Sequence, residues 1–195
     1  MKKRKLLLAA IALLLVLFIG GTAAYFTDTE EVTNTFTLGN IDITLTEPNF
    51  DSNDALGLMP GASVTKDPRV NNIGNAPAYV FIKVVEPCYN GNKVFTYTPD
   101  SSWAVVGSAG TCGASATETT TVYGYGSSAA MTELQASNST SALFSSVVLN
   151  SNLDATAINA LNQRTSIEIV LTAYAIQSDN LSSVVPTSVW ANFTP

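Results

Sequence analysis

An unbroken apolar run opens the chain, and a long stretch in which apolar and polar residues alternate follows it. Residues 6–19 are all apolar, with a basic segment (residues 2–5) before them and small residues at 20–24. This order is typical of an export signal with a cleavage site. We expect a signal peptide over residues 1–24, which a signal peptidase cuts between Ala24 and Tyr25. The alternative is an uncleaved anchor, because residues 6–26 just reach the length of a membrane-spanning helix.

Alternation with a period of two predicts β-strands in the rest of the chain. Residues 41–45 alternate apolar and polar side chains, as in a half-buried strand. Residues 79–85 form a nearly continuous β-branched and aromatic run, which predicts a central core strand that Pro87 ends. Shorter strands are expected at residues 94–98, 103–106, 119–125, 143–149 and 167–176.

Helical patterns are rare, so the elements predict an all-β fold. Residues 154–161 begin with the capping residue Asp154 and predict a short helix. The sequence Asn90-Gly91-Asn92 is a hairpin signal between two strands. Many short strands and few helices indicate a two-sheet antiparallel sandwich over residues 41–195, with a few short helices in its loops. The pattern alone does not choose between a jelly roll and an immunoglobulin-like topology.

Two segments rich in Ser, Thr, Gly and Ala carry almost no charge. They cover residues 107–128 and 135–141. Each is either an exposed insertion or a plain loop.

The segment that follows the expected cleavage site has a strand pattern of its own. Over residues 25–38 the larger apolar groups after Tyr25 fall on even positions, at Phe26, Val32, Phe36 and Leu38. The apolar positions become odd after Gly39, as they would at a bulge or hinge. Such a strand can pair within its own subunit, or it can complete the sheet of a neighbour. Exchange would build a head-to-tail homopolymer.

Three blocks of sequence resemble the TasA/CalY (camelysin) family. They are GGTAAYFTDTE…NTFTLGNIDITL at the start, residues 60–80 with PGASVTKDP and NNIGNAPAYV, and IEIVLTAYAIQ at residues 167–177. Members are secreted bacterial proteins, processed by a dedicated signal peptidase and best known as biofilm-matrix fibre subunits. The resemblance implies a jelly-roll sandwich, a donor strand and hinge over residues 25–40, and exchange of that strand between subunits. Residues 88–141 depart from the family pattern.

Charge and cysteine content narrow the classes of partner and compartment. Loss of residues 1–24 removes four of nine basic residues and none of the fifteen acids, so the net charge moves from −6 to −10. Such a surface repels nucleic acid and anionic lipid, so we expect neither as a partner and no stable membrane insertion after cleavage. Cys88 and Cys112 are the only cysteines. In an exported chain they predict a disulfide, and two free buried thiols are the alternative.

Catalytic patterns are weak. The chain has no histidine, which removes the usual general base and the HExxH zinc motif. Ser63 and Lys66 match S-x-x-K without its partner motifs, and Lys66 with Asp67 more simply predicts a solvated pair. Residues 51–54 resemble a calcium loop in composition only and predict a turn. We expect no catalytic residue, no metal site and no cofactor.

The sequence therefore predicts a secreted structural subunit of extracellular fibres. Its anchors would be Phe26, Val32, Phe36 and Leu38, with Gly39 as the hinge. The alternatives are a secreted endopeptidase of camelysin type and a monomeric cell-surface adhesin. The absence of histidine argues against the endopeptidase.

Overall fold

The computed structural model describes residues 39–164, 167–179, 181 and 184–192. Every structural statement below concerns these residues. The predicted signal peptide, its cleavage site at Ala24 and Tyr25, and the anchors Phe26, Val32, Phe36 and Leu38 lie outside them. Gly39 is the first residue described.

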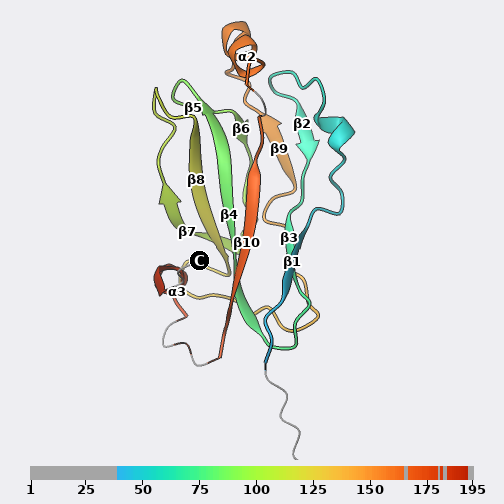
Figure 1. The fold of residues 1–195 in the computed structure, drawn as a ribbon, viewed down its shortest axis with the longest axis vertical. Helices are drawn as coiled ribbons and strands as arrows, with labels where there is room; N and C mark the ends of the chain where they lie inside the picture. The colour runs from blue at the N-terminus through green and yellow to red at the C-terminus, as the bar shows by residue number, and fades with distance from the viewer. Residues whose placement is uncertain (1–38, 165–166, 180, 182–183, 193–195) are drawn as a thin grey trace, which may run out of the picture. The chain divides into compact units, whose positions relative to one another are not determined.

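The strands form two facing layers, and all of their pairings are antiparallel (Figure 1). One layer is a five-stranded sheet with the order β10 (Val170–Gln177), β4 (Ala78–Tyr89), β8 (Glu118–Tyr125) and β7 (Trp103–Ala109). Its fifth strand, β5 (Asn92–Lys93), pairs with the end of β4. The other layer contains two smaller sheets. One has the order β2 (Ser63–Thr65), β9 (Ser146–Leu149) and β6 (Phe95–Thr96), and the other pairs β1 (Ile43–Thr46) with β3 (Arg69–Asn72). The predicted all-β, two-sheet sandwich is confirmed.

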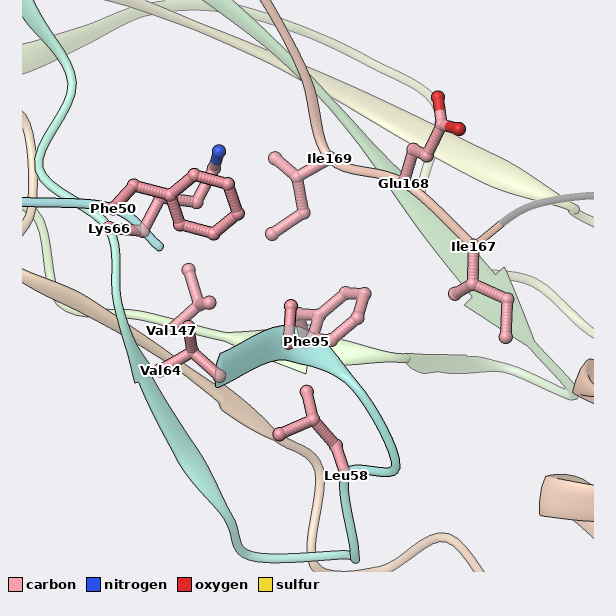
Figure 2. Close-up of a pocket in the computed structure, with 10 residues that line it drawn as sticks. Phe50, Leu58, Val64, Lys66, Phe95, Val147, Ile167, Glu168 and Ile169 are labelled. Carbon is pink, nitrogen blue, oxygen red and sulfur yellow. The ribbon is translucent and has the colours of Figure 1, made fainter. Parts of the chain in front are cut away.

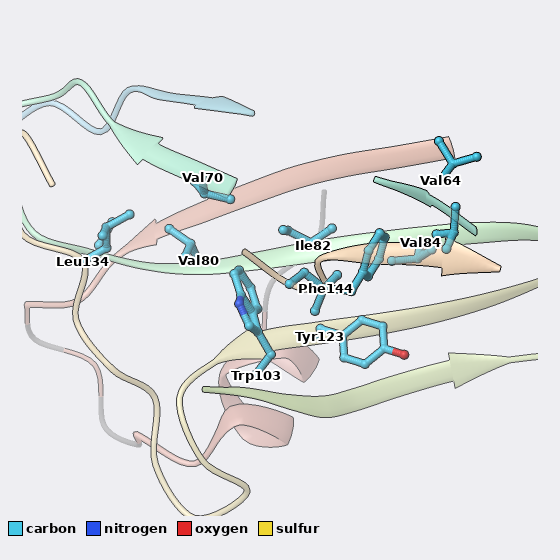
Figure 3. Close-up of a cluster of buried hydrophobic side chains, with 12 residues drawn as sticks. Val64, Val70, Val80, Ile82, Val84, Trp103, Tyr123, Leu134 and Phe144 are labelled. Carbon is cyan, nitrogen blue, oxygen red and sulfur yellow. The ribbon is translucent and has the colours of Figure 1, made fainter. Parts of the chain in front are cut away.

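The main core lies between these layers, and the central strand β4 supplies one wall of it. Alternate β4 residues from Ala78 to Val84 face the core, where they meet Val64 of β2, Val70 of β3 and Val147 of β9. Figure 3 shows Trp103 and Tyr123, from β7 and β8, on the same side as Ile82. On the other side of the sheet Tyr79 and Phe81 are also buried, and Lys83 and Val85 are partly buried. Burial on both faces explains why residues 79–85 read as continuously apolar.

A helix that the sequence analysis missed covers the outer face of the large sheet. This helix, α3 (Pro186–Asn192), places the Trp190 ring 5.1 Å from Phe81 and 5.5 Å from Tyr174. Val189 is buried in the same cluster. Its one sequence signal is Pro186 at the first helical position, where a missing N–H is tolerated. The helix has only seven residues, too few for a clear period.

The predicted helix at residues 154–161 is confirmed as α2 (Ala155–Leu161). The Asp154 carboxylate caps it by accepting a hydrogen bond from the Ala157 N–H at 2.8 Å. Ala157 and Leu161 are buried against Val94, which closes one end of the sandwich. Asp51 caps a shorter 3-10 helix, η1 (Ser52–Ala55), so residues 51–54 form a turn as expected.

The prediction that Pro87 ends the central strand is wrong, because β4 continues to Tyr89. Pro87 pairs with Glu118 of β8, and the next residue, Cys88, donates its N–H to the β8 side, to the carbonyl of Thr117. Because donors alternate along a strand, the missing N–H of Pro87 faces the β10 side. Pairing with β10 stops at Val85. At Pro87 that side is occupied by Val94, which donates its N–H to the Pro87 carbonyl while its own carbonyl accepts from the Asn150 N–H, so the missing donor leaves no carbonyl unpaired.

Two further expectations concern the stretch between β4 and β9. The hairpin at Asn90 and Gly91 is confirmed: Tyr89 pairs with Asn92, and the two turn residues have φ of 46° and 82°. The expectation of a loop or insertion over residues 107–128 is wrong for half of that range. Residues 107–109 belong to β7 and residues 118–125 to β8, while residues 110–117 connect the two strands and residues 126–128 follow β8.

Candidate functional site

The open edge of the large sheet is the most distinctive feature of the described fold. Strand β10 stands at the end of the strand order and, among the described residues, pairs only with β4. Its eight residues, VLTAYAIQ, include no charge, glycine or proline, and the register with β4 is unbroken. Soluble proteins usually protect a sheet edge with one of these devices or with a bulge. Strand β1 lies close to β10 but forms no ladder with it, so the β10 edge is a candidate template for another strand.

The opposite edge of the same sheet, strand β7, is protected. Its register with β8 shifts between Val105 and Gly107, which marks a bulge. Helix α3 lies against β7, and a Cβ on Gly107 would be 3.4 Å from Trp190 Nε1. A bulge and a covering helix both discourage strand addition. The two edges of this sheet thus differ in their capacity to accept a partner.

An apolar groove opens beside the start of β10. It has a volume of about 380 Å³ and is lined by Phe50, Ala55, Leu58, Val64, Lys66, Phe95, Val147, Ile167, Glu168 and Ile169. Figure 2 shows Phe50, Ile169, Phe95 and Val147 pointing toward one another, while the Glu168 carboxylate points away from them. The lining comes from β2, β6 and β9 on one side and from the residues leading into β10 on the other. The groove therefore lies where the two layers are open.

The one cation in the groove wall is neutralised locally. Lys66 Nζ lies 2.7 Å from Glu47 Oε1 and 4.6 Å from the centre of the Phe50 ring. The predicted pairing of Lys66 with Asp67 is wrong. Asp67 is buried and accepts hydrogen bonds from the backbone and side chain of Asn49 at 3.0 and 2.8 Å. With Lys66 held by Glu47, the groove presents an apolar surface.

The described chain begins at the other end of β10. A Cβ on Gly39 would lie 3.2 Å from the Cβ of Ala76 and 3.9 Å from the side-chain Nε2 of Gln177, the last residue of β10. Asn40 is fixed beside it, because its N–H donates to Asn75 Oδ1 at 2.6 Å and its carbonyl accepts from the Asn75 N–H at 3.1 Å. The described chain therefore starts at the end of β10 that is remote from the groove.

A second cluster of polar side chains lies inside the sandwich. The Glu86 carboxylate is fully buried and forms an ion pair with Lys93. Nearby, the hydroxyls of Tyr97 and Tyr123 lie 3.3 Å apart. Burial and the hydrogen bond to Tyr123 raise the pKa of the Tyr97 hydroxyl far above its usual range, so it stays protonated. Because the Glu86 charge is compensated by Lys93, the cluster has the character of a structural network.

Potential metal ligands do not gather in the part of the chain that the structure describes. No group of three or more Cys, Asp or Glu side chains there could hold a metal ion. The cysteines are unavailable as ligands, because Cys88 and Cys112 form the predicted disulfide, with their Cα atoms 5.4 Å apart. This donor set does not fit the tetrahedral nitrogen and sulfur environment of a hydrolytic zinc ion. Ser63 is exposed on β2, and Lys66 is already paired with Glu47.

Comparison with known proteins gives one family. The family model described as camelysin metallo-endopeptidase matches residues 1–83. The matched residues that the structure describes run from Gly39 through β1, η1, β2 and β3 to Lys83 in β4. No curated protein matches the chain. Within the described residues, no helix combines the length and apolar character needed to cross a membrane. The resemblance to the TasA/CalY (camelysin) family predicted from the sequence is confirmed over residues 1–83.

Proposed function

We propose that this protein is a secreted structural subunit of extracellular fibres, in which residues 25–38 of one subunit complete the sheet of the next along β10. One observation carries the proposal: a regular, uncharged edge strand runs beside an apolar groove. Backbone groups on such an edge are satisfied by an added strand, and alternate side chains of that strand fill the groove. Export by cleavage between Ala24 and Tyr25 would free the donor segment.

The direction of the chain favours exchange over a strand that stays in its own subunit. Gly39 lies beside Gln177, where β10 ends. A segment that reaches Gly39 along its own β10 would run parallel to that strand. In a neighbour stacked end to end, Gly39 would stand at the groove, and the segment would run antiparallel to β10. Every strand pairing described in this fold is antiparallel, and antiparallel pairs are slightly more stable per residue.

This direction also predicts which anchors fill the groove. Phe36 and Leu38 are the apolar side chains nearest to Gly39, so they would enter the space beside Ile169. Residues 33–38 carry no charge, which suits an apolar lining. Phe26 and Val32 would lie further along β10. Fourteen extended residues span about 46 Å, and the eight residues of β10 span about 26 Å. The segment is thus long enough to cover both the strand and the groove.

The decisive experiment follows polymerisation of the mature chain, residues 25–195, by electron microscopy and sedimentation. Phe36→Lys should abolish filaments, because the cation would have to enter an apolar groove without a partner. Thr35→Lys is the matched control. It places the same charge on the opposite side of the donor strand and should leave filaments intact. If Phe36→Lys forms filaments like those of the wild type, strand exchange into the groove is wrong.

The acceptor side is tested separately. Ile169→Glu changes the groove wall and should give monomers that fold normally by circular dichroism but do not assemble. Mixed with the wild type, these monomers can still donate their own residues 25–38, so they should shorten wild-type filaments by capping one end. Normal filaments from Ile169→Glu alone would refute the assignment of the groove.

The family description supplies the alternative, a metallo-endopeptidase. We expect pure mature protein to leave casein intact with and without a chelator, since the described residues offer no zinc ligand set. Chelator-sensitive turnover that disappears when one carboxylate of this chain is replaced would favour the peptidase.

A further inference from the structure

We propose a second contact between neighbouring subunits, in which Ile73 at one end of the domain packs against Leu56 and Met59 at the other end of the next copy. The contact rests on the proposed function, because end-to-end stacking follows from strand exchange. It uses none of the residues of the donor segment or of the groove wall. Its occupant is a second copy of this chain.

The three side chains are the most exposed large apolar groups in the described structure. Leu56 is 75% exposed, Met59 72% and Ile73 58%. Leu56 and Met59 lie together on the segment between η1 and β2, which carries no charge from Ala55 to Thr65. One exposed aliphatic residue needs no explanation. Here, however, Leu56 and Met59 lie on one short segment and Ile73 lies at the opposite end of the domain, so in two stacked copies these side chains could cover each other.

The segment with Leu56 and Met59 lies at the groove end of the domain. Leu58, between them, lines the groove itself. The Gly61 N–H donates to the Leu149 carbonyl at 2.7 Å, which ties the segment to the end of β9. Figure 1 shows this segment at the same end as α2. Its exposed side chains therefore form part of the rim of the groove that receives the neighbour.

Ile73 lies at the opposite end, in the turn between β3 and β4, and is fixed to the point where the donor segment leaves. The Ile73 and Gly74 N–H groups donate to the Asp42 carbonyl at 2.9 and 3.0 Å, and the Asn75 N–H donates to the Asn40 carbonyl. A Cβ on Gly74 would lie 2.3 Å from the Asn40 carbonyl oxygen. This close approach leaves no room for a side chain, so the turn and Asn40 form one unit.

The contact follows from joining these two ends. When Leu38 of one subunit enters the groove of the next, Gly39 and Asn40 stand at the rim. The turn that is hydrogen-bonded to Asn40 comes with them, and it brings Ile73 to Leu56 and Met59. Burial of three aliphatic side chains would add to the association of a head-to-tail interface. The donor strand would link one subunit to the next, and this contact would fix how the two domains are oriented relative to each other.

Two charge variants of the mature chain test the contact. Ile73→Asp should raise the protein concentration needed for filament formation at least tenfold, because a carboxylate would be buried against Leu56 and Met59. Val105→Asp is the matched control. Val105 is 57% exposed but lies on β7, away from both ends, so its variant should assemble like the wild type. Adding Leu56→Lys to Ile73→Asp should recover assembly through an ion pair.

Cysteine cross-linking tests whether residue 73 of one subunit lies next to residue 56 of its neighbour. A chain with Leu56→Cys and Ile73→Cys should form, on mild oxidation of filaments, a ladder of disulfide-linked multimers that reductant removes. The Ile73→Cys chain with Val105→Cys should give none. Wild-type filaments together with normal assembly of Ile73→Asp and no ladder would refute this contact but leave strand exchange standing. If the wild-type mature chain forms no filaments, the proposed function fails, and the contact fails with it.

Discussion

Loss of the Cys88–Cys112 disulfide should lower the free energy of unfolding without preventing assembly. The two cysteines are 24 residues apart, and closing a loop of that length stabilises the folded state by about 3.5 kcal/mol on the chain-entropy model. Cys112→Ser is the cleanest change, because it keeps the buried Cys88 sulfur in place and leaves no cavity. Cys112 itself is half-buried in a connection whose side chains are mostly exposed, so few native contacts are lost.

Urea unfolding of the mature Phe36→Lys variant, which should stay monomeric, gives the measurement. With a slope of about 2 kcal/mol per molar urea, the loss corresponds to a midpoint lower by about 1.7 M. The chain that keeps both cysteines is the control: after reduction it should unfold at the same urea concentration as the Cys112→Ser variant. A difference below about 1 kcal/mol between oxidised and Cys112→Ser protein would refute the reasoning. It would mean that the Cys88–Cys112 bond restricts the unfolded chain little.

Three further predictions concern the core, the outer helix and export. Lys93→Met should destabilise the domain by about 3 kcal/mol, because it leaves the buried Glu86 carboxylate without its partner. Adding Glu86→Leu should recover most of that loss. Urea unfolding of the single and double variants is the measurement, and equal stability of the two would count against the Glu86–Lys93 ion pair. Trp190→Ala should cost about 3 kcal/mol through its contacts with Phe81, and an unchanged thermal midpoint would show that α3 adds no stability. Intact-mass analysis of secreted protein should give a chain that starts at Tyr25, and a mass that includes Met1 would contradict cleavage.

Local patterns predicted the elements whose burial alternates or whose caps are explicit. The strand near residues 79–85, the helix after Asp154 and the Asn90-Gly91 hairpin all follow from spacing within a few residues. The end of β4 was misplaced because Pro87 was judged by its missing donor alone. Whether that donor matters depends on which segments lie on that side of β4, and β10 begins only 83 residues later in the sequence, at Val170 (170 − 87 = 83).

The candidate site could be predicted only in part, for the same reason. The proposed donor segment, residues 25–38, is a continuous stretch with a visible alternation. The groove is assembled from Phe50, Val64, Val147 and Ile169, which no local pattern connects. The openness of the β10 edge is a property of strand order, and that order is set by pairings far apart in sequence. The interpretation of Lys66 failed likewise, because its partner Glu47 lies 19 residues before it.

The different protection of β10 and β7 fixes the valency of the subunit. With β7 closed by its bulge and by α3, the large sheet of the described residues has one acceptor edge, and under the proposed strand exchange each copy would supply one donor. Assembly on that basis produces unbranched threads, and the two tips of a thread are chemically unlike: one carries an empty groove and the other an unused strand. Any network made from such threads must then be held together by lateral contacts or by other molecules, because the strand-exchange chemistry offers no branch point.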